Sequence, residues 1–387
     1  MKKILIIVSI SLIVIIGALF AYVSVKGVPE GAREIFGKFG DSGEAPVFTP
    51  EEEESESFED WEEGDANSGR ARRLRQLTTR PVAGAVFTDS TVRFVERGTG
   101  HIYEMDTRSG GAERIISGTT IPRTIRAVFS SSGEQVVLTS EMDGKLTSVL
   151  GEIGNTDAGL DVTSLPPDAK EAGFPGMSTT TLNFFVPNER GGTAYAYSLI
   201  KGEAVELFTI PLRDVRIQWG TPTYLYTTPS YQTDGYVYKI DKSGMEYVTN
   251  GGKGLMAIHH ASGTVVSTVI DGKIESRDTR TGSLPILSMI TEKCAVEKIT
   301  SRRLVCASPI DAQGANLPDD WFKGIVGLSD RLLLVDSASS SVTVLSSLEQ
   351  EAGRPIDVTR IGTDASGTRI YMINKYDGAL WMLDLSL

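Results

Sequence analysis

Short runs of apolar and β-branched residues, broken by polar turns, dominate the chain from Arg80 onward. Between Arg80 and Ser117 there are four such runs: VAGAVF, VRFVER, HIYEMD and AERII. Runs of this length, bounded by Gly, Ser, Asp or Thr, predict four β-strands in series. A single four-stranded sheet cannot bury both of its faces, so we expect further copies of it to pack alongside.

The four-strand pattern recurs along the rest of the chain. Six further units are predicted at 125–150, 180–210, 215–248, 255–287, 293–345 and 355–385. A repeat of about 40–45 residues with four strands in each copy is the sequence signature of a β-propeller. We therefore predict an all-β fold, a β-propeller of seven four-stranded blades.

Turn residues recur at matching places in these units. The first hairpin carries Ser-Gly at Ser132, Ser262 and Ser366, and the second carries Asp-Gly at Asp143, Asp234, Asp271 and Asp377. Asp-Gly suits a type I′ turn, because both central residues of that turn need a positive φ.

The last unit predicts how the propeller closes. The chain ends after three strands of this unit, which would leave an unpaired sheet edge. The segment Arg72–Thr78 places Leu74 and Leu77 in the alternating pattern of an outer strand. We expect it to close the ring by pairing with the last blade. The alternative is that it continues the preceding linker.

Two segments interrupt the repeat. Gly151–Gly176 is rich in Gly, Asp and Pro and is expected to be an insertion, and Pro309–Ser329 divides the sixth unit. Because loops carry function more often than the sheets that hold them, an acidic and aromatic cluster in the second segment is the candidate binding site. It consists of Asp319, Asp320, Trp321 and Phe322. The alternative is a plug in which the two aromatic rings pack over the ring of blades.

The N-terminus predicts a membrane anchor. Residues 1–3 form a short tail with two lysines, and residues 4–25 are an unbroken apolar run. About 20 apolar residues span a bilayer as a helix, and the flanking lysines favour a cytoplasmic N-terminus. We expect a single-pass protein of the cell membrane whose remaining chain is extracytoplasmic. The alternative is a cleaved signal peptide, but no small-x-small cleavage site follows the run.

Charge separates the next segment from the propeller domain predicted at 71–387. The chain has 50 acidic and 38 basic residues, and ten of the acidic ones lie in Glu51–Asp65. Residues 26–70 therefore predict a disordered acidic tether, which is either a solvated spacer or a docking tail. The remainder is close to neutral, which argues against nucleic-acid binding by the folded domain.

The chain has two cysteines, Cys294 and Cys306. A hairpin turn centred near Thr300 would place them directly opposite each other, within disulfide range. An extracytoplasmic location favours oxidation. The alternatives are two buried free thiols or a metal pair that lacks other ligands.

Catalytic and cofactor motifs are absent from the sequence. There is no HExxH, P-loop, GxSxG or paired zinc spacing, and the adjacent His259 and His260 would point to opposite faces of a strand. We therefore assign no catalytic residue, metal or cofactor, and the sequence favours a protein that is not an enzyme.

Several stretches resemble those of a known family. They are Arg75–Phe87, VRFVERGTGHIYEMDT, TTIPRTIRAVF, the two cysteines and LPDDWFKG. Together with the anchor and the tether, they resemble an uncharacterised family of membrane-anchored, WD40-like propeller proteins of candidate-phyla bacteria. The resemblance covers most of Leu74–Leu385 and implies the fold, but no activity.

The expected function follows from these features. A rigid ring with variable loops, held at the membrane, is suited to binding an envelope protein or a glycan. The alternative is a propeller hydrolase or lyase that acts on a polysaccharide or cell-wall component. Acids, Arg and His converging on the central channel would favour the enzyme, whereas an apolar rim around Trp321 and Phe322 would favour the binding platform.

Overall fold

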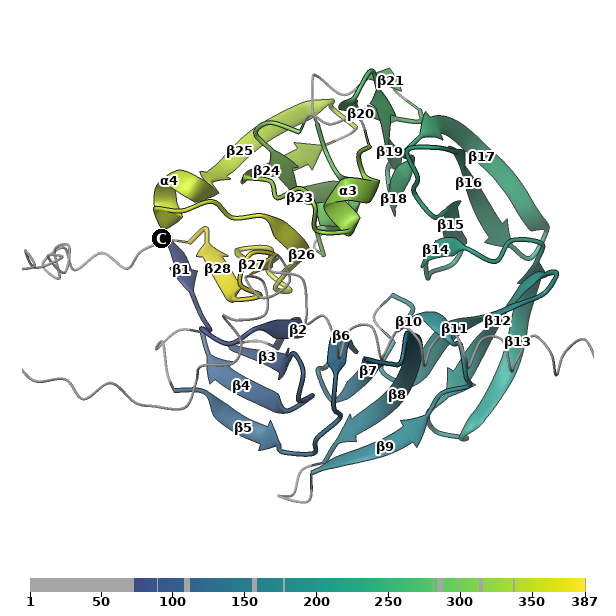
Figure 1. Ribbon diagram of the computed structural model, residues 1–387, viewed down its shortest axis with the longest axis vertical. Coiled ribbons are helices and arrows are strands. Elements are labelled where there is room, and N and C mark those ends of the chain that lie inside the picture. The colour runs from purple at the N-terminus through teal and green to yellow at the C-terminus, as the bar shows by residue number, and fades with distance from the viewer. Residues whose placement is uncertain are drawn as a thin grey trace, which may run out of the picture. The chain divides into compact units, whose positions relative to one another are not determined.

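Seven four-stranded antiparallel sheets make up the folded part of the chain (Figure 1). The structure is a computed structural model that describes residues 73–88, 90–107, 112–154, 159–176, 178–280, 282–283, 288–298, 300–312, 316–336 and 338–386. The predicted anchor and tether lie outside these residues. Among the described residues, no helix is long and apolar enough to cross a bilayer.

The first four blades follow one another along the chain. Blade one consists of β2 (Val82–Thr88), β3 (Thr91–Glu96), β4 (Ile102–Asp106) and β5 (Arg114–Ser117). Blade two consists of β6 (Thr124–Phe129), β7 (Gln135–Met142), β8 (Lys145–Ile153) and β9 (Leu160–Ser164). Blade three consists of β10 (Lys170–Gly173), β11 (Thr181–Asn188), β12 (Gly191–Ser198) and β13 (Glu203–Ile210). Blade four consists of β14 (Val215–Gln218), β15 (Thr223–Thr227), β16 (Asp234–Asp241) and β17 (Gly244–Lys253).

The last three blades contain the short helices. Blade five consists of β18 (Met256–His260), β19 (Gly263–Ile270), β20 (Lys273–Asp278) and β21 (Gly282–Ser283). The 3₁₀ helix η2 (Thr291–Lys293) leads into blade six, which consists of β22 (Cys294–Val296), β23 (Arg303–Pro309), β24 (Asp330–Asp336) and β25 (Ser341–Ser347). Helix α3 (Asp319–Phe322) lies between β23 and β24, and helix α4 (Leu348–Ala352) follows β25. Blade seven consists of β26 (Val358–Thr363), β27 (Arg369–Asn374), β28 (Leu380–Asp384) and β1 (Leu74–Gln76).

The predicted closure of the ring is confirmed. Strand β1 pairs with β28, so the first strand of the domain completes the sheet that the last three begin. Leu74 is 4% exposed and packs among the core residues between blades six and seven. The alternative, in which Arg72–Thr78 only continues the preceding linker, is therefore wrong.

The prediction that Gly151–Gly176 is an insertion is wrong. These residues contain β9, the outer strand of blade two, and β10, the inner strand of blade three. Strand β9 is largely exposed on both faces, and β10 is a four-residue strand with an irregular register against β11. Neither strand has the alternation of apolar and polar residues by which a half-buried strand is recognised.

The Asp-Gly turns are confirmed in part. Asp143-Gly144 and Asp271-Gly272 both have two positive φ angles, as a type I′ turn requires. The prediction for Asp234-Gly235 is wrong, because this pair begins strand β16. A Cβ atom on Gly235 would lie 2.4 Å from Cβ of Leu255, so the glycine there permits close packing between blades.

The hydrophobic core lies between the faces of adjacent blades. The cluster between blades one and two, for example, contains Ala83, Val95, Ile102, Val136 and Leu138. Each sheet thus buries its faces against its neighbours, which is why the four-strand unit needs copies on either side.

The predicted disulfide is confirmed. Cys294 and Cys306 are directly paired residues of β22 and β23, their Cα atoms are 4.1 Å apart, and their sulfur atoms are bonded. Counting from the turn therefore predicted the correct register for this hairpin.

Candidate functional site

The inner strands of the blades line a central cavity of about 780 Å³. Its polar lining comes from six of the seven blades and includes Arg126, Glu171, Arg216, Glu292, Arg360 and Lys375. A second cavity of about 390 Å³ shares Glu292 and Arg360 with the first. The second cavity extends toward the C-terminal ends of the inner strands, where Ser130, Phe174 and Lys298 line it. We call the two cavities together the central channel.

Arg216 is held in place by a set of acceptors on one side of the channel. Its guanidinium lies 3.1 Å from Oε1 of Glu171 and 3.6 Å from Oε1 of Glu292. Tyr226 donates its hydroxyl hydrogen to the same Glu292 oxygen at 2.9 Å. Burial alone would lower the pKa of Arg216, but Glu292 and Glu171 outweigh it and raise that pKa. This arginine is compensated before any ligand binds.

Arg126 and Arg360 are different, because neither side chain makes a hydrogen bond or an ion pair with any residue that the structure describes. Nε of Arg126 is buried without an acceptor, as is Nε of Arg216, so the two arginines differ in their ion pairs and not in this atom. Burial, and then the charge of Arg126, lower the pKa of Arg360 to about 9, which leaves it charged at neutral pH. Glu292 acts in the opposite direction, but it forms no ion pair with Arg360. Two positive charges therefore stand close together in the channel without a carboxylate at ion-pair distance, an arrangement that an anionic ligand would stabilise.

Glu171 has a backbone conformation that few residues adopt. Its φ is +50°, in the left-handed region, although it belongs to strand β10. Three contacts hold it there: Trp219 donates to its carbonyl at 2.6 Å, the backbone N–H of Ile217 donates to its carboxylate at 3.2 Å, and Arg216 pairs with it. Such a conformation costs on the order of 1–3 kcal/mol and is found preferentially at functional sites. Here it turns the carboxylate toward Arg216.

The structure divides the predicted binding cluster. Trp321 and Phe322 line the central cavity, and their rings lie 5.0 Å apart. Trp321 is 4% exposed and Phe322 is 37% exposed, so Phe322 presents the larger free surface. Asp319 instead accepts a hydrogen bond from the backbone N–H of Tyr231 at 2.7 Å, and neither Asp319 nor Asp320 lines the cavity. A binding role for the four residues stays a prediction.

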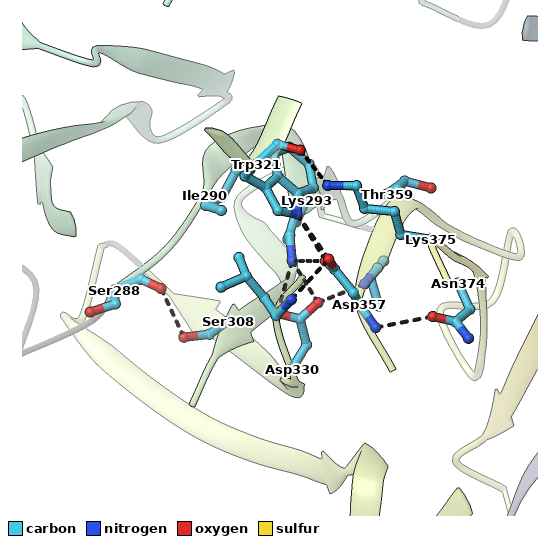
Figure 2. Close-up of polar contacts among 12 residues, drawn as sticks. Ser288, Ile290, Lys293, Ser308, Trp321, Asp330, Asp357, Thr359, Asn374 and Lys375 are labelled. Atoms are coloured by element: carbon cyan, nitrogen blue, oxygen red, sulfur yellow. Dashed lines mark hydrogen bonds and ion pairs between the residues drawn. The ribbon is translucent and has the colours of Figure 1, made fainter. Parts of the chain in front are cut away.

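Beneath Trp321, Lys293 forms a buried ionic network with two carboxylates (Figure 2). Nζ of Lys293 lies 2.8 Å from Asp330 and 2.6 Å from Asp357, and all three side chains are inaccessible to solvent. Burial raises the pKa of Asp330, and Lys293 acts in the opposite direction. The network joins η2, the start of β24 and the segment that enters β26.

The same network fixes Trp321 at the cavity. The indole N–H donates to both carboxylate oxygens of Asp357, at 3.0 and 3.1 Å (Figure 2). Lys375 donates to the backbone carbonyl of Trp321, and the ammonium groups of Lys293 and Lys375 lie 4.8 and 4.5 Å from the centre of its ring. Trp321 is therefore a rigid wall of the cavity, positioned by buried charges.

The histidines do not line the central channel. His259 stacks on Tyr224 with ring centroids 3.5 Å apart, and His260 is buried with Nε2 4.0 Å from Asp278. Within the described part of the chain, no group of three His, Cys, Asp or Glu residues could hold a metal ion.

The three inner-strand arginines among the four that line the central cavity were not predicted, although the sequence carries a signal for them. Each occupies the second or third position of an inner strand, in TIRAVF, VRIQ and VTRIGT. An arginine recurring at the inner-strand position of separate repeats indicates a shared position around the ring axis. It could have been read from the sequence once the repeats were aligned.

Comparisons with known proteins define the fold class. No protein-family model matches the chain, and no curated protein matches it. Solved structures that resemble it include a β-propeller domain and WD40 repeats, and the described part of the chain is a seven-bladed, WD40-like β-propeller in architecture.

Three of these structures illustrate the range. The β-propeller domain of the trilobed protease from Pyrococcus furiosus is similar with a TM-score of 0.52 and 10% identity, over 79% of this chain and 95% of that one. The WD40 repeats of RRP9 give a TM-score of 0.52 and 12% identity, over 81% and 97%. An oligogalacturonate lyase in complex with manganese gives a TM-score of 0.53 and 12% identity, over 82% and 94%.

These neighbours include both WD40 repeats and enzymes, so the likeness is one of fold alone. One of them differs from this chain in how its ring closes. The Pyrococcus domain is described as having an open velcro topology, whereas here β1 pairs with β28.

Proposed function

We propose that this protein is a membrane-tethered, extracytoplasmic binding propeller whose central channel takes an acidic component of the cell envelope. The observation that carries the proposal is the pair Arg126 and Arg360, which lie in the channel without a carboxylate partner among the described residues. Arginine is the side chain best suited to bidentate binding of carboxylate and phosphate groups.

The rim of the cavity supports binding of a sugar-like ligand. Trp321, Phe322, Tyr226 and Ile258 surround the charged groups with apolar and aromatic surface. Ligand pockets of about 300–1,000 Å³ are usually lined this way, with a few convergent polar groups that fix the orientation. The predicted envelope glycan, in an acidic form, suits both parts of this lining.

The alternative is an enzyme of the lyase or hydrolase class that acts on an acidic polysaccharide. Arginines and the acids Glu171 and Glu292 converge in the channel, and acids and arginines that converge there favour an enzyme. Both glutamates, however, contact Arg216, and the histidines lie elsewhere. Because an acid or base must reach the substrate proton, this engagement favours the binding protein.

The experiment is a binding measurement on the full-length chain in phosphatidylcholine vesicles. One probe is an acidic oligosaccharide, such as oligogalacturonate. The other is the same oligosaccharide with its carboxyl groups reduced to alcohols, which makes it neutral. We expect the acidic probe alone to bind, and Arg126→Gln or Arg360→Gln to weaken it at least tenfold. Arg190→Gln, in an exposed turn, is the matched control.

Two results would contradict the proposal. Equal binding of the acidic and neutral probes would remove the role of the arginines. Turnover of the acidic probe that is lost in Glu171→Gln and Glu292→Gln would establish the enzyme instead.

A further inference from the structure

A third cavity, of about 320 Å³, opens beside the central channel, among blades two, three and four. It shares Arg126, Glu171 and Arg216 with the central cavity, so the two meet at the charged groups. Its size is at the lower end of the usual range for ligand pockets, about 300–1,000 Å³. We call it the side cavity.

The wall of the side cavity is apolar in part. Val128 and Val137 line it from blade two, and Ala169 and Ala172 line it from the other side. Val137 and Ala169 are buried, and they belong to the core cluster that joins blades two and three. Charged side chains complete the wall, among them Arg213 and the exposed ion pair of Lys170 and Asp214, 3.7 Å apart.

Two polar side chains in the wall contact each other. Thr139 and Ser148, both of which line the side cavity, lie within 3.0 Å of each other and share a hydrogen bond. One hydroxyl donates this hydrogen bond, and the hydrogen of the other stays available. The apolar part of the side cavity, away from this pair, suits a hydrocarbon group.

A charge stands at the inner end of this apolar space. Arg126 reaches the boundary of both cavities, and its Nε is buried without an acceptor. Glu171, a carboxylate of blade three that lines both cavities, pairs instead with Arg216. The structure thus places an uncompensated cation next to an apolar space of limited volume.

We propose that the side cavity binds the acyl or alkyl group of a carboxylate ligand whose acidic head pairs with Arg126. This inference rests on the proposed function, because it assumes that the channel takes an acidic ligand. It narrows that ligand to an amphiphilic acid, which carries an apolar substituent near its carboxylate.

The test uses straight-chain carboxylates as probes. Acetate, butanoate and hexanoate are titrated into the full-length chain in phosphatidylcholine vesicles, and binding is followed by ligand-observed NMR against empty vesicles. Each methylene buried in the side cavity is expected to tighten binding by about fourfold. Hexanoate, with four more methylenes, should therefore bind about 250-fold more tightly than acetate if all four are buried.

Two variants fill the side cavity from different walls. Ala172→Leu acts from β10, and Thr228→Ile acts from the exposed edge. Both are expected to abolish the dependence on chain length and to leave acetate binding within about twofold of the wild type. Ala204→Leu, on the exposed outer strand β13, is the matched control and should keep the full dependence. Near-ultraviolet circular dichroism identifies a filled variant that fails to fold. In that case the other filled variant tests whether the dependence on chain length is lost.

The outcomes separate this inference from the proposed function. If all three carboxylates bind equally to the wild type, or if the filled variants keep the dependence on chain length, the side cavity takes no apolar group and the inference is wrong. Acidic-glycan binding that needs Arg126 and Arg360 would still stand. If neither glycan nor carboxylate binds, the proposed function is wrong as well.

Discussion

Leu74 lies directly opposite Leu383 in the sheet of blade seven, so the first strand of the domain pairs with the last. Arg75 and Gln76 continue the ladder against Met382 and Trp381. The ring is therefore closed by non-covalent contacts at a single place. The stability of the whole domain should depend on a three-residue strand.

We expect Leu74→Ala to lower the free energy of unfolding by about 2–5 kcal/mol, because it removes a buried side chain and leaves a cavity. The effect should be measured by denaturant unfolding of the full-length chain. Gln76→Ala, at an exposed position of the same strand, should cost well under half as much. Equal effects of the two substitutions would show that β1 does not close the ring.

The buried network predicts a large effect at Lys293. We expect Lys293→Met to destabilise the protein by about 3–5 kcal/mol, since Asp330 and Asp357 would remain buried without a cation. Denaturant unfolding measures the loss. Adding Asp330→Asn and Asp357→Asn should restore part of the stability, because the uncompensated charges then disappear. A triple variant less stable than Lys293→Met would contradict this account.

The disulfide predicts sensitivity to reduction. Cys294 and Cys306 are separated by 12 positions, and closing a loop of about 15 residues contributes about 3 kcal/mol by the chain-entropy model. We expect Cys294→Ser with Cys306→Ser to lose stability by an amount of this order. Mass mapping of the protein isolated from its cells without reductant should find the two residues linked. Two free thiols would contradict the extracytoplasmic location that we propose.

His259 predicts a loss of stability in mild acid. Burial, followed by the charges of His260 and Arg280, lowers the pKa of His259 from 6.5 to about 4 in the folded protein. The unfolded chain therefore binds more protons between these values, and stability falls as the pH drops from 6.5 toward 4. His259→Phe keeps a ring against Tyr224 and cannot titrate. We expect its free energy of unfolding to fall less steeply across this window than that of the wild type, and equal slopes would contradict the assignment.

Arg360 predicts the opposite pH dependence for ligand binding. Its pKa of about 9, lowered by burial and by Arg126, means that it carries its charge at pH 7 and loses it at higher pH. Binding of an acidic probe should weaken as the pH rises through about 9. The residual binding of Arg360→Gln should change less over the same range. Affinity that is constant from pH 7 to 10 would show that Arg360 does not contact the anion.

The sequence predicted the architecture well, because each blade carries its own local signals. Alternating runs and turn residues such as Asp143-Gly144 and Asp271-Gly272 act within a few residues of each other. Prediction failed where tertiary contacts replace local pattern. Strand β10 holds Glu171 at a positive φ through contacts with Trp219 and Ile217 from blade four, and no local rule reports that.

The candidate site was predicted only in part, for a related reason. Trp321 and Phe322 stood out as an aromatic pair in a loop, and both line the cavity. The arginines were harder to recognise, because a charged residue in a strand ordinarily faces solvent. Only the closed ring brings Arg126, Arg216 and Arg360 from three blades into one channel. Whether each arginine pairs with a carboxylate depends on which side chains meet in that channel.

Because β1 and β28 are neighbours in one sheet, the described domain begins and finishes at the same blade (Figure 1). A short linker joining the two ends, with new termini cut between blades three and four, would give a circular permutant with every sheet intact. In that permutant the strand that completes blade seven would no longer be terminal, so fraying of the chain end could not open the ring there.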